Sequence, residues 1–247
     1  MKHSFTCYFV ALALGLFPLT SWAETSSGGP APASDSKATT PAPADTSKAA
    51  PTASAPAASV KPPRLSGKAG EVQTYVESLF ETSKGVNSTD AAEKNKARAK
   101  IETAVDWEAI SHECLGKANW KKASAANRAE FEKLLKDVIL RTAYSRLDKF
   151  WTGTTYSVPK VDLTGSSAHV PAKFVADGEE MSLDYYFREK KHKWLLYDIS
   201  FEGTRYSSNI SEQIDSFLAQ GNFKQLIEKL KKRREELISD ADSSSRR

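Results

Sequence analysis

The feature that most constrains the fold is a stretch of alternating residues in the last third of the chain, from Met181 to Gly203. Apolar side chains occupy every second position on both sides of a charged turn, namely Met181, Leu183, Tyr185 and Phe187, then Leu195, Tyr197, Ile199 and Phe201. Because successive side chains of a β-strand point to opposite faces, this pattern predicts a hairpin with one apolar face. A face with so many rings can belong to a packed core or to the wall of a ligand cavity.

The same period of two begins earlier, so the hairpin is part of a larger sheet. Four segments are predicted as strands: TTYSVPKVDL, SAHVPAKFVA, EEMSLDYYFRE and KWLLYDISFE. Turns lie at Gly165, Asp177-Gly178 and Lys190–His192, and strands joined by such short turns are antiparallel. Pro159 and Pro171 cannot donate a ladder hydrogen bond, so they predict edges or bulges and a strongly curved sheet.

Helices are predicted on both sides of these strands, because apolar residues there recur with a helical period. Before the sheet the predicted helices are Gly67–Lys84, Asp90–Val105, a short helix capped by Asp106 and ended by Gly116, and a long helix from Ser124 to Phe150. Two more follow the sheet and are separated at Gly221-Asn222. This order predicts an α+β fold: a curved antiparallel sheet of about four strands, wrapped by N- and C-terminal helices.

The N-terminal part of the chain predicts export. Lys2 and His3 precede an apolar run and then Ser21-Trp22-Ala23, which is typical of a cleaved secretory signal peptide over residues 1–23. Residues 24–66 are rich in Ala, Pro, Ser and Thr, so we expect a disordered linker. The folded domain is then expected over residues 67–238, followed by a disordered tail at 239–247.

The composition and motifs argue against several functions. The chain has 35 Lys and Arg against 31 Asp and Glu, so no strong electrostatic footprint for nucleic acid is present. No His-Glu-x-x-His, paired Cys-x-x-Cys or Gly-rich loop occurs, so no metal or cofactor is predicted. Cys114 shares an apolar stripe with Ile110 and is expected to be a buried packing residue. Asp184 and Asp198, on neighbouring strands, are the candidate acid–base pair.

The polar residues thus do not converge on a reaction, whereas the apolar residues converge on one volume. The apolar rows of the strands face the apolar stripe of the long helix. A domain of this size needs a core, and a curved sheet can also enclose space that its own side chains leave open. The residues by themselves leave both a filled core and a ligand cavity open.

Three segments, taken in order, resemble a known family. The first is VDWEAISHECLGKANW, with Asp106, Trp107, Ile110, Leu115, Gly116 and Trp120 in matching positions. The second is SAANRAEFEKLLKDVILRTAYSRLDKF, with Phe131, Leu135 and Tyr144. The third is LDYYFREKKHKWLLYDISFEG, with Asp184, Tyr185, Trp194, Tyr197, Asp198, Glu202 and Gly203. Together they are similar to the MlaC-like periplasmic phospholipid-binding proteins, the toluene tolerance family, over about Val72 to Leu237.

This resemblance implies a nuclear-transport-factor-like core that encloses an apolar cavity for the acyl chains of a phospholipid. It also implies a monomeric periplasmic carrier, not an enzyme, that shuttles phospholipid between an outer-membrane complex and an inner-membrane ABC transporter complex and so maintains outer-membrane lipid asymmetry. The residues expected to line the cavity are Phe131, Leu135, Val138, Ile139, Val170, Phe174, Leu183, Tyr185, Phe187, Leu195, Tyr197, Ile199 and Phe201.

One segment departs from the family pattern, and three alternatives accompany the carrier hypothesis. After Glu202-Gly203 the family usually carries an Asn-Tyr-Arg triplet, but here Ile210 and Ser211 follow Asn209. The alternatives are a carrier of another hydrophobic ligand, such as a hopanoid or sterol-like lipid; an enzyme using Asp184 and Asp198; and a structural module of the envelope with a filled core.

Overall fold

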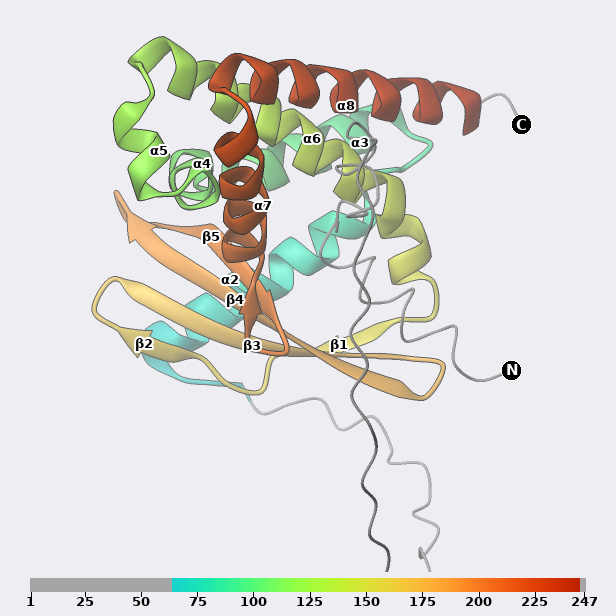
Figure 1. Cartoon of the computed structure of the whole chain (residues 1–247). Coiled ribbons are helices and arrows are strands. Elements are labelled where there is room, and N and C mark those ends of the chain that lie inside the picture. The colour runs from blue at the N-terminus through green and yellow to red at the C-terminus, as the bar shows by residue number, and fades with distance from the viewer. Residues whose placement is uncertain (1–63, 245–247) are drawn as a thin grey trace, which may run out of the picture. The chain divides into compact units, whose positions relative to one another are not determined.

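The computed structural model describes residues 64–244. Six antiparallel strands in this range form one curved sheet (Figure 1). The strands are β1 (Thr155–Ser157), β2 (Asp162–Thr164), β3 (Ser167–Ala176), β4 (Glu179–Lys190), β5 (Lys193–Phe201) and β6 (Thr204–Arg205). Their order is β1-β3-β4-β5-β6, with β2 also paired to β3, so the sheet is open. The predicted signal peptide and nearly all of the predicted linker lie outside the described residues.

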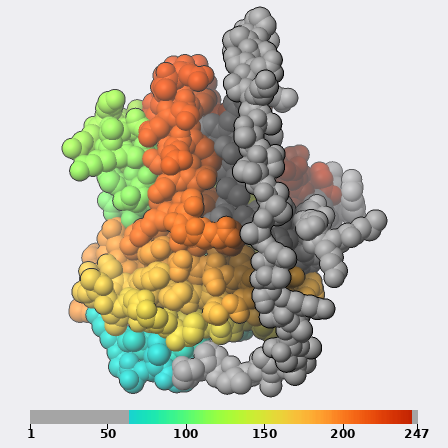
Figure 2. Space-filling model, turned by 60° about the horizontal axis from the view of Figure 1, so that its bottom comes forward, coloured from blue at the N-terminus to red at the C-terminus, as the bar shows by residue number. Residues whose placement is uncertain are grey.

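Helices precede and follow the sheet, which confirms the predicted α+β class. They are α2 (Gly67–Lys84), α3 (Ala91–Thr103), α4 (Trp107–Leu115), α5 (Lys117–Lys122), α6 (Ala125–Trp151), α7 (Tyr206–Gln220) and α8 (Phe223–Ser244). In Figure 1, α6 and α8 run side by side above the sheet, and in Figure 2 the strands form a band between α2 and α7. Within the described part of the chain, no helix combines the length and apolar character that a membrane span requires.

The main core lies between α2 and one face of the sheet. Val72 and Val76 of α2 are fully buried against Val170 and Phe174 of β3 and Phe187 of β4. These strand residues belong to the predicted apolar rows, because alternate positions of β3 and β4 share this face. We call it the inner face of the sheet.

The strand count differs from the prediction in two places: β6 was not predicted, and the first predicted strand is divided. The segment that was expected to form one strand divides into β1 and β2, which pair with opposite ends of β3. Pro159 lies in the break and has no N–H to donate to the ladder. Val158 turns inward there and is fully buried, and its carbonyl accepts a hydrogen bond of 2.8 Å from Nε2 of the buried Gln73. The strand therefore ends where Pro159 cannot donate a ladder hydrogen bond and where the preceding side chain, Val158, packs into the core.

The predicted helix ends are mostly confirmed by their capping geometry. Side chains of Asp90, Asp106 and Ser124 each accept a hydrogen bond from a backbone N–H in the first turn of α3, α4 and α6. Gly116 ends α4 at φ 75°, a conformation that glycine adopts at little cost. At the C-terminus, α8 continues to Ser244, past the predicted end of the domain at residue 238.

The connection between α3 and α4 docks on the edge of β5 and thereby closes one side of the inner face. Val105 forms a parallel bridge with Leu196. The N–H of Leu196 donates to the Ala104 carbonyl and the N–H of Asp106 donates to the Leu196 carbonyl, each at 2.8 Å. This pairing brings the end of α3 against the sheet.

Candidate functional site: an apolar pocket

An apolar pocket of about 200 Å³ lies beside the main core on the inner face of the sheet. Its walls come from α2, the end of α3 with its connection to α4, the C-terminal half of α6, and strands β4 and β5. Seventeen residues line it, and Arg146 is the one charged side chain among these described lining residues. The pocket thus has the apolar walls and sparse polar groups that are typical of small-molecule sites.

The strand wall contains Leu183, Tyr185, Phe187 and Ile199, four of the residues expected to line a lipid cavity. Burial raises the pKa of the Tyr185 phenol, so this group stays protonated at neutral pH. These four side chains share the inner face because the alternation predicted for the hairpin holds along β4 and at the end of β5.

The alternation fails in the middle of β5, where the structure places Leu196 in the pocket instead of Leu195. Tyr186 pairs with Asp198 but Phe187 pairs with Leu196, so Tyr197 has no partner and forms a bulge. The Arg188 guanidinium lies 5.9 Å from the centre of the Tyr197 ring, outside the pocket. Leu195 and Tyr197 therefore do not line the pocket. The adjacent leucines at 195 and 196 were the sequence signal that the strict alternation is interrupted.

The helix wall comes from a different part of α6 than expected. The pocket is not lined by Phe131, Leu135, Val138 or Ile139, which lie in the N-terminal part and the middle of the helix. The Phe131 ring lies 6.4 Å from that of Phe223 in α8. The lining residues on α6 are Ala143, Arg146, Leu147, Phe150 and Trp151. They continue the same helical stripe by one to three turns, and the sequence offered no signal for which half faces the sheet.

The remaining expected residues fill the core next to the pocket. Val170 and Phe174 are buried, and Phe201 packs against the same cluster. The Phe174 ring lies 5.3 Å from Phe80 and 5.2 Å from Phe150, two residues that also line the pocket. One part of the hairpin's apolar face therefore belongs to the filled core, and the adjoining part lines the pocket.

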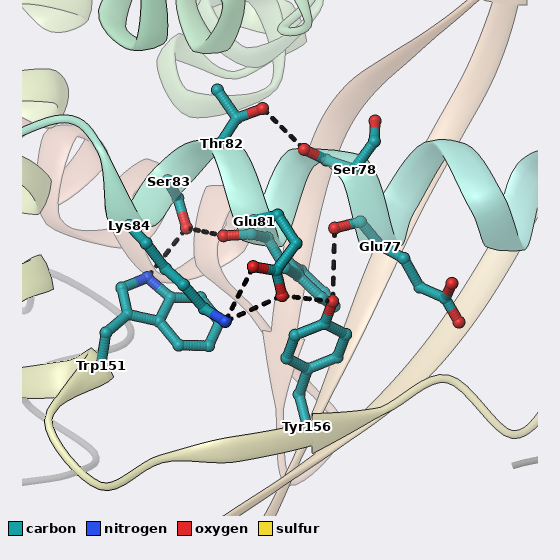
Figure 3. A network of polar contacts seen from close by, with 9 residues as sticks. Glu77, Ser78, Glu81, Thr82, Ser83, Lys84, Trp151 and Tyr156 are labelled. Atoms are coloured by element: carbon teal, nitrogen blue, oxygen red, sulfur yellow. Dashed lines mark hydrogen bonds and ion pairs between the residues drawn. The ribbon is translucent and has the colours of Figure 1, made fainter. Parts of the chain in front are cut away.

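A polar network fixes Trp151 at the edge of the pocket (Figure 3). Its indole Nε1 donates a 2.8 Å hydrogen bond to the Ser83 hydroxyl of α2. The Lys84 ammonium lies 5.2 Å from the indole centroid and is itself held by Glu81. Tyr156 of β1 donates to the same carboxylate at 2.8 Å. The end of α6, the end of α2 and β1 are thus tied together beside the pocket.

The candidate acid–base pair lies outside the pocket. Asp184 is 2.9 Å from Nε2 of His169 and accepts from the Ser200 hydroxyl at 3.2 Å. Asp198 accepts from both the backbone N–H and the hydroxyl of Ser207. Each carboxylate is held by its own hydrogen-bond partners, so the two do not form a shared site.

Cys114 and the metal-ligating residue types also show no reactive arrangement among the described residues. Cys114 is fully buried, and burial strongly raises the pKa of its thiol, so the nucleophilic thiolate is not formed at neutral pH. Among residues 64–244, no cluster of three or more His, Cys, Asp or Glu side chains has the arrangement of a metal site.

Two of three comparisons with known proteins find a match. The family model described as MlaC protein matches residues 72–232. A search of curated proteins finds no match. Among solved structures, the phospholipid-binding protein from Ralstonia solanacearum, determined in complex with a phospholipid, is similar with a TM-score of 0.56 and 18% identity, over 67% of this chain and 98% of that one. The family model spans more than half of the sequence, and the chain belongs to the MlaC family.

Proposed function

We propose that this protein is a periplasmic phospholipid carrier that holds acyl chains in the apolar pocket. The observation that carries the proposal is the pocket lining, in which sixteen of seventeen residues are uncharged and most are aliphatic or aromatic. Membership of the MlaC family and the phospholipid bound by the R. solanacearum protein support it. The signal peptide predicted from residues 1–23 supports export.

The energetics explain why a carrier is needed. Each buried methylene is worth about 0.8 kcal/mol, so an acyl chain of about a dozen methylenes resists transfer into water by roughly 10 kcal/mol. We propose that the protein receives phospholipid from one membrane complex and delivers it to another, between the outer membrane and an inner-membrane ABC transporter. Because the present volume of about 200 Å³ is below the roughly 300–1,000 Å³ of common ligand pockets, the walls have to move apart when a lipid enters.

The geometry favours a carrier over the alternatives. An enzyme on this fold needs reactive groups that converge on the substrate, and Asp184 and Asp198 lie outside the pocket. A structural module would need a filled core, whereas the inner face is open beside Phe80 and Phe150.

The proposal is tested by native mass spectrometry of the chain without residues 1–23, purified from a periplasm without detergent, with chromatography of its organic extract. We expect a bound mass that matches diacyl phospholipids. A hopanoid mass would assign the pocket to that ligand, and lysophospholipid accumulating from added substrate would indicate an enzyme. Protein that is free of lipid and also fails to take up labelled phosphatidylglycerol would refute the carrier function.

A further inference from the structure

The short helix α5 forms a corner of the fold that carries three lysines around a tryptophan. Lys117, Lys121 and Lys122 are exposed, and none of them forms an ion pair with another residue in the range 64–244. Lys117, Trp120 and Lys121 lie on one face of the helix, because residues three and four positions apart are neighbours there. In Figure 2 the green segment that contains α4 and α5 stands out beside α7. The corner is therefore a projecting basic surface.

Two contacts hold Trp120 at this corner. The Arg128 guanidinium lies 5.3 Å from the centre of the indole ring, and its Nε donates a 3.0 Å hydrogen bond to the Ala123 carbonyl. The His112 ring meets the indole edge-to-face, with 5.2 Å between the ring centres. The indole is nevertheless only half-buried, so part of its apolar surface remains accessible. We name the following residues the α5 patch: Lys117, Trp120, Lys121, Lys122 and Arg128.

The carboxylates near the α5 patch do not cancel its charge. Glu113 lies 3.6 Å from Nδ1 of His112, and Asp215 accepts a 2.6 Å hydrogen bond from the Asn119 amide. Four cations against these two carboxylates leave the corner positive. The other basic run of the chain, on α8, differs because three of its cations pair with carboxylates: Lys231 with Glu130, Arg233 with Glu236 and Arg234 with Asp137.

We propose that the α5 patch binds the surface of an anionic phospholipid bilayer. The inference goes beyond the proposed carrier function, because it assigns to the chain a direct contact with a membrane. Charge complementarity favours an anionic partner. The combination of lysine with tryptophan favours a membrane over a protein, since lysine is depleted in protein–protein interfaces, whereas lysine and tryptophan together are typical of segments at the lipid–water boundary.

The test is flotation of the chain without residues 1–23 with two kinds of vesicle, at low and at high salt. One kind is phosphatidylcholine alone, and the other is a mixture of phosphatidylcholine with phosphatidylglycerol. The patch variant K117Q/K121Q/K122Q removes three charges, and the rescue variant K117R/K121R/K122R keeps them. The matched control removes three exposed lysines that lie on α3 and at the C-terminal end of α6: K96Q/K100Q/K149Q.

We expect the wild-type chain to bind the anionic vesicles more tightly than the neutral ones, with an affinity that falls as the salt concentration rises. The patch variant should bind the anionic vesicles at least about tenfold more weakly, because each lysine near such a surface strengthens binding by about fivefold. The rescue and control variants should stay within about twofold of the wild type.

Equal loss of binding in the patch and control variants would overturn the inference, because net charge and not the α5 patch would then carry the binding. An absence of binding to anionic vesicles at low salt would also overturn it and would leave an acidic protein surface as the partner of the patch. Neither result changes the lipid retained in the pocket, so failure here is distinct from failure of the carrier function. Circular dichroism of each variant establishes that it is folded.

Discussion

Leu195 and Leu196 are chemically identical, and as neighbours in a strand they point to opposite faces of β5. The bulge at Tyr197 decides that Leu196 is the one on the inner face. Only Leu196 lines the pocket, although both side chains are half-buried. Substituting a charged residue at one position or the other therefore separates the effect of a charge in the pocket from the effect of a charge elsewhere on the same strand.

We expect Leu196→Asp to reduce the phospholipid retained per protein by at least about tenfold, because a carboxylate in the pocket must be desolvated against acyl chains. Leu195→Asp is the matched control and should retain lipid. Native mass spectrometry after loading with phosphatidylglycerol measures both. Equal loss in the two folded variants would contradict the wall assignment.

Asp106 links the start of α4 to β4 through one buried carboxylate. It caps α4 through the Ala109 N–H, and it forms ion pairs with Arg188 and Lys190 of β4. Burial by itself would raise the pKa of Asp106, but the hydrogen bonds from Arg188 and Lys190 and from the cap outweigh it, so the pKa is lowered. A carboxyl whose pKa is lower in the folded state stabilises the fold above its unfolded pKa of about 4, and this contribution is lost as the pH falls through the folded value.

We therefore predict that Asp106→Asn lowers the free energy of unfolding by about 1–3 kcal/mol at pH 7, since asparagine can cap the helix but cannot pair with two cations. The difference from the wild type should shrink as the pH is lowered toward 3. Asp90→Asn is the control, because Asp90 is an exposed N-cap, and it should change stability by about 0.5 kcal/mol or less. Urea unfolding across this pH range measures all three proteins, and a pH-independent difference would argue against the ion-pair explanation.

At the scale of elements, the 27-residue helix α6 contacts different parts of the molecule along its length. At 1.5 Å per residue it is about 40 Å long. Its N-terminal half contacts α8, where the Phe131 ring lies near Phe223, and its C-terminal half lines the pocket. The hydrogen bond from Trp151 to Ser83 ties the pocket end of this helix to the end of α2.

Ser83→Ala should destabilise the protein by about 1 kcal/mol more than Ser78→Ala. Both hydroxyls donate to a carbonyl three residues earlier in α2, but only Ser83 also accepts from Trp151. Subtracting the two effects, measured by urea unfolding, isolates the link between the helices. If the two substitutions cost the same, Trp151 is held at the pocket by packing and by Lys84 instead.

At the scale of the whole folded domain, the pocket adjoins a packed core, and a ligand that fills it should stabilise the native state. A ligand that binds only the folded protein stabilises it by about 2.7 kcal/mol at one hundred times its Kd. For a domain of this size, that corresponds to a rise in Tm of roughly 5 °C or more.

We expect this rise when the delipidated protein is loaded with phosphatidylglycerol and followed by calorimetry. Glycerophosphoglycerol, which has the headgroup without acyl chains, serves as the control and should leave Tm unchanged, because burial of the chains supplies the binding energy. A Tm that responds equally to both compounds would place the ligand outside the apolar pocket.

Local sequence patterns were enough to predict the fold class, the three long strands and most of the helices, but not the division between β1 and β2, the short strand β6 or the short helix α5. The caps at Asp90, Asp106 and Ser124, the stop at Gly116 and the alternation in β3 and β4 are local signals, because they depend on residues within one or two turns or on neighbouring positions in a strand. The family resemblance added the expected arrangement.

Which apolar residues line the pocket depends on contacts between parts of the chain that are far apart in the sequence. The bulge that moves Leu196 inward depends on how β5 pairs with β4 and with the α3–α4 connection, and the use of Leu147 and Phe150 instead of Phe131 depends on where α6 crosses the sheet. A filled core and an open pocket require the same apolar residues. They differ in the volume left between segments far apart in the chain, which periodicity does not encode.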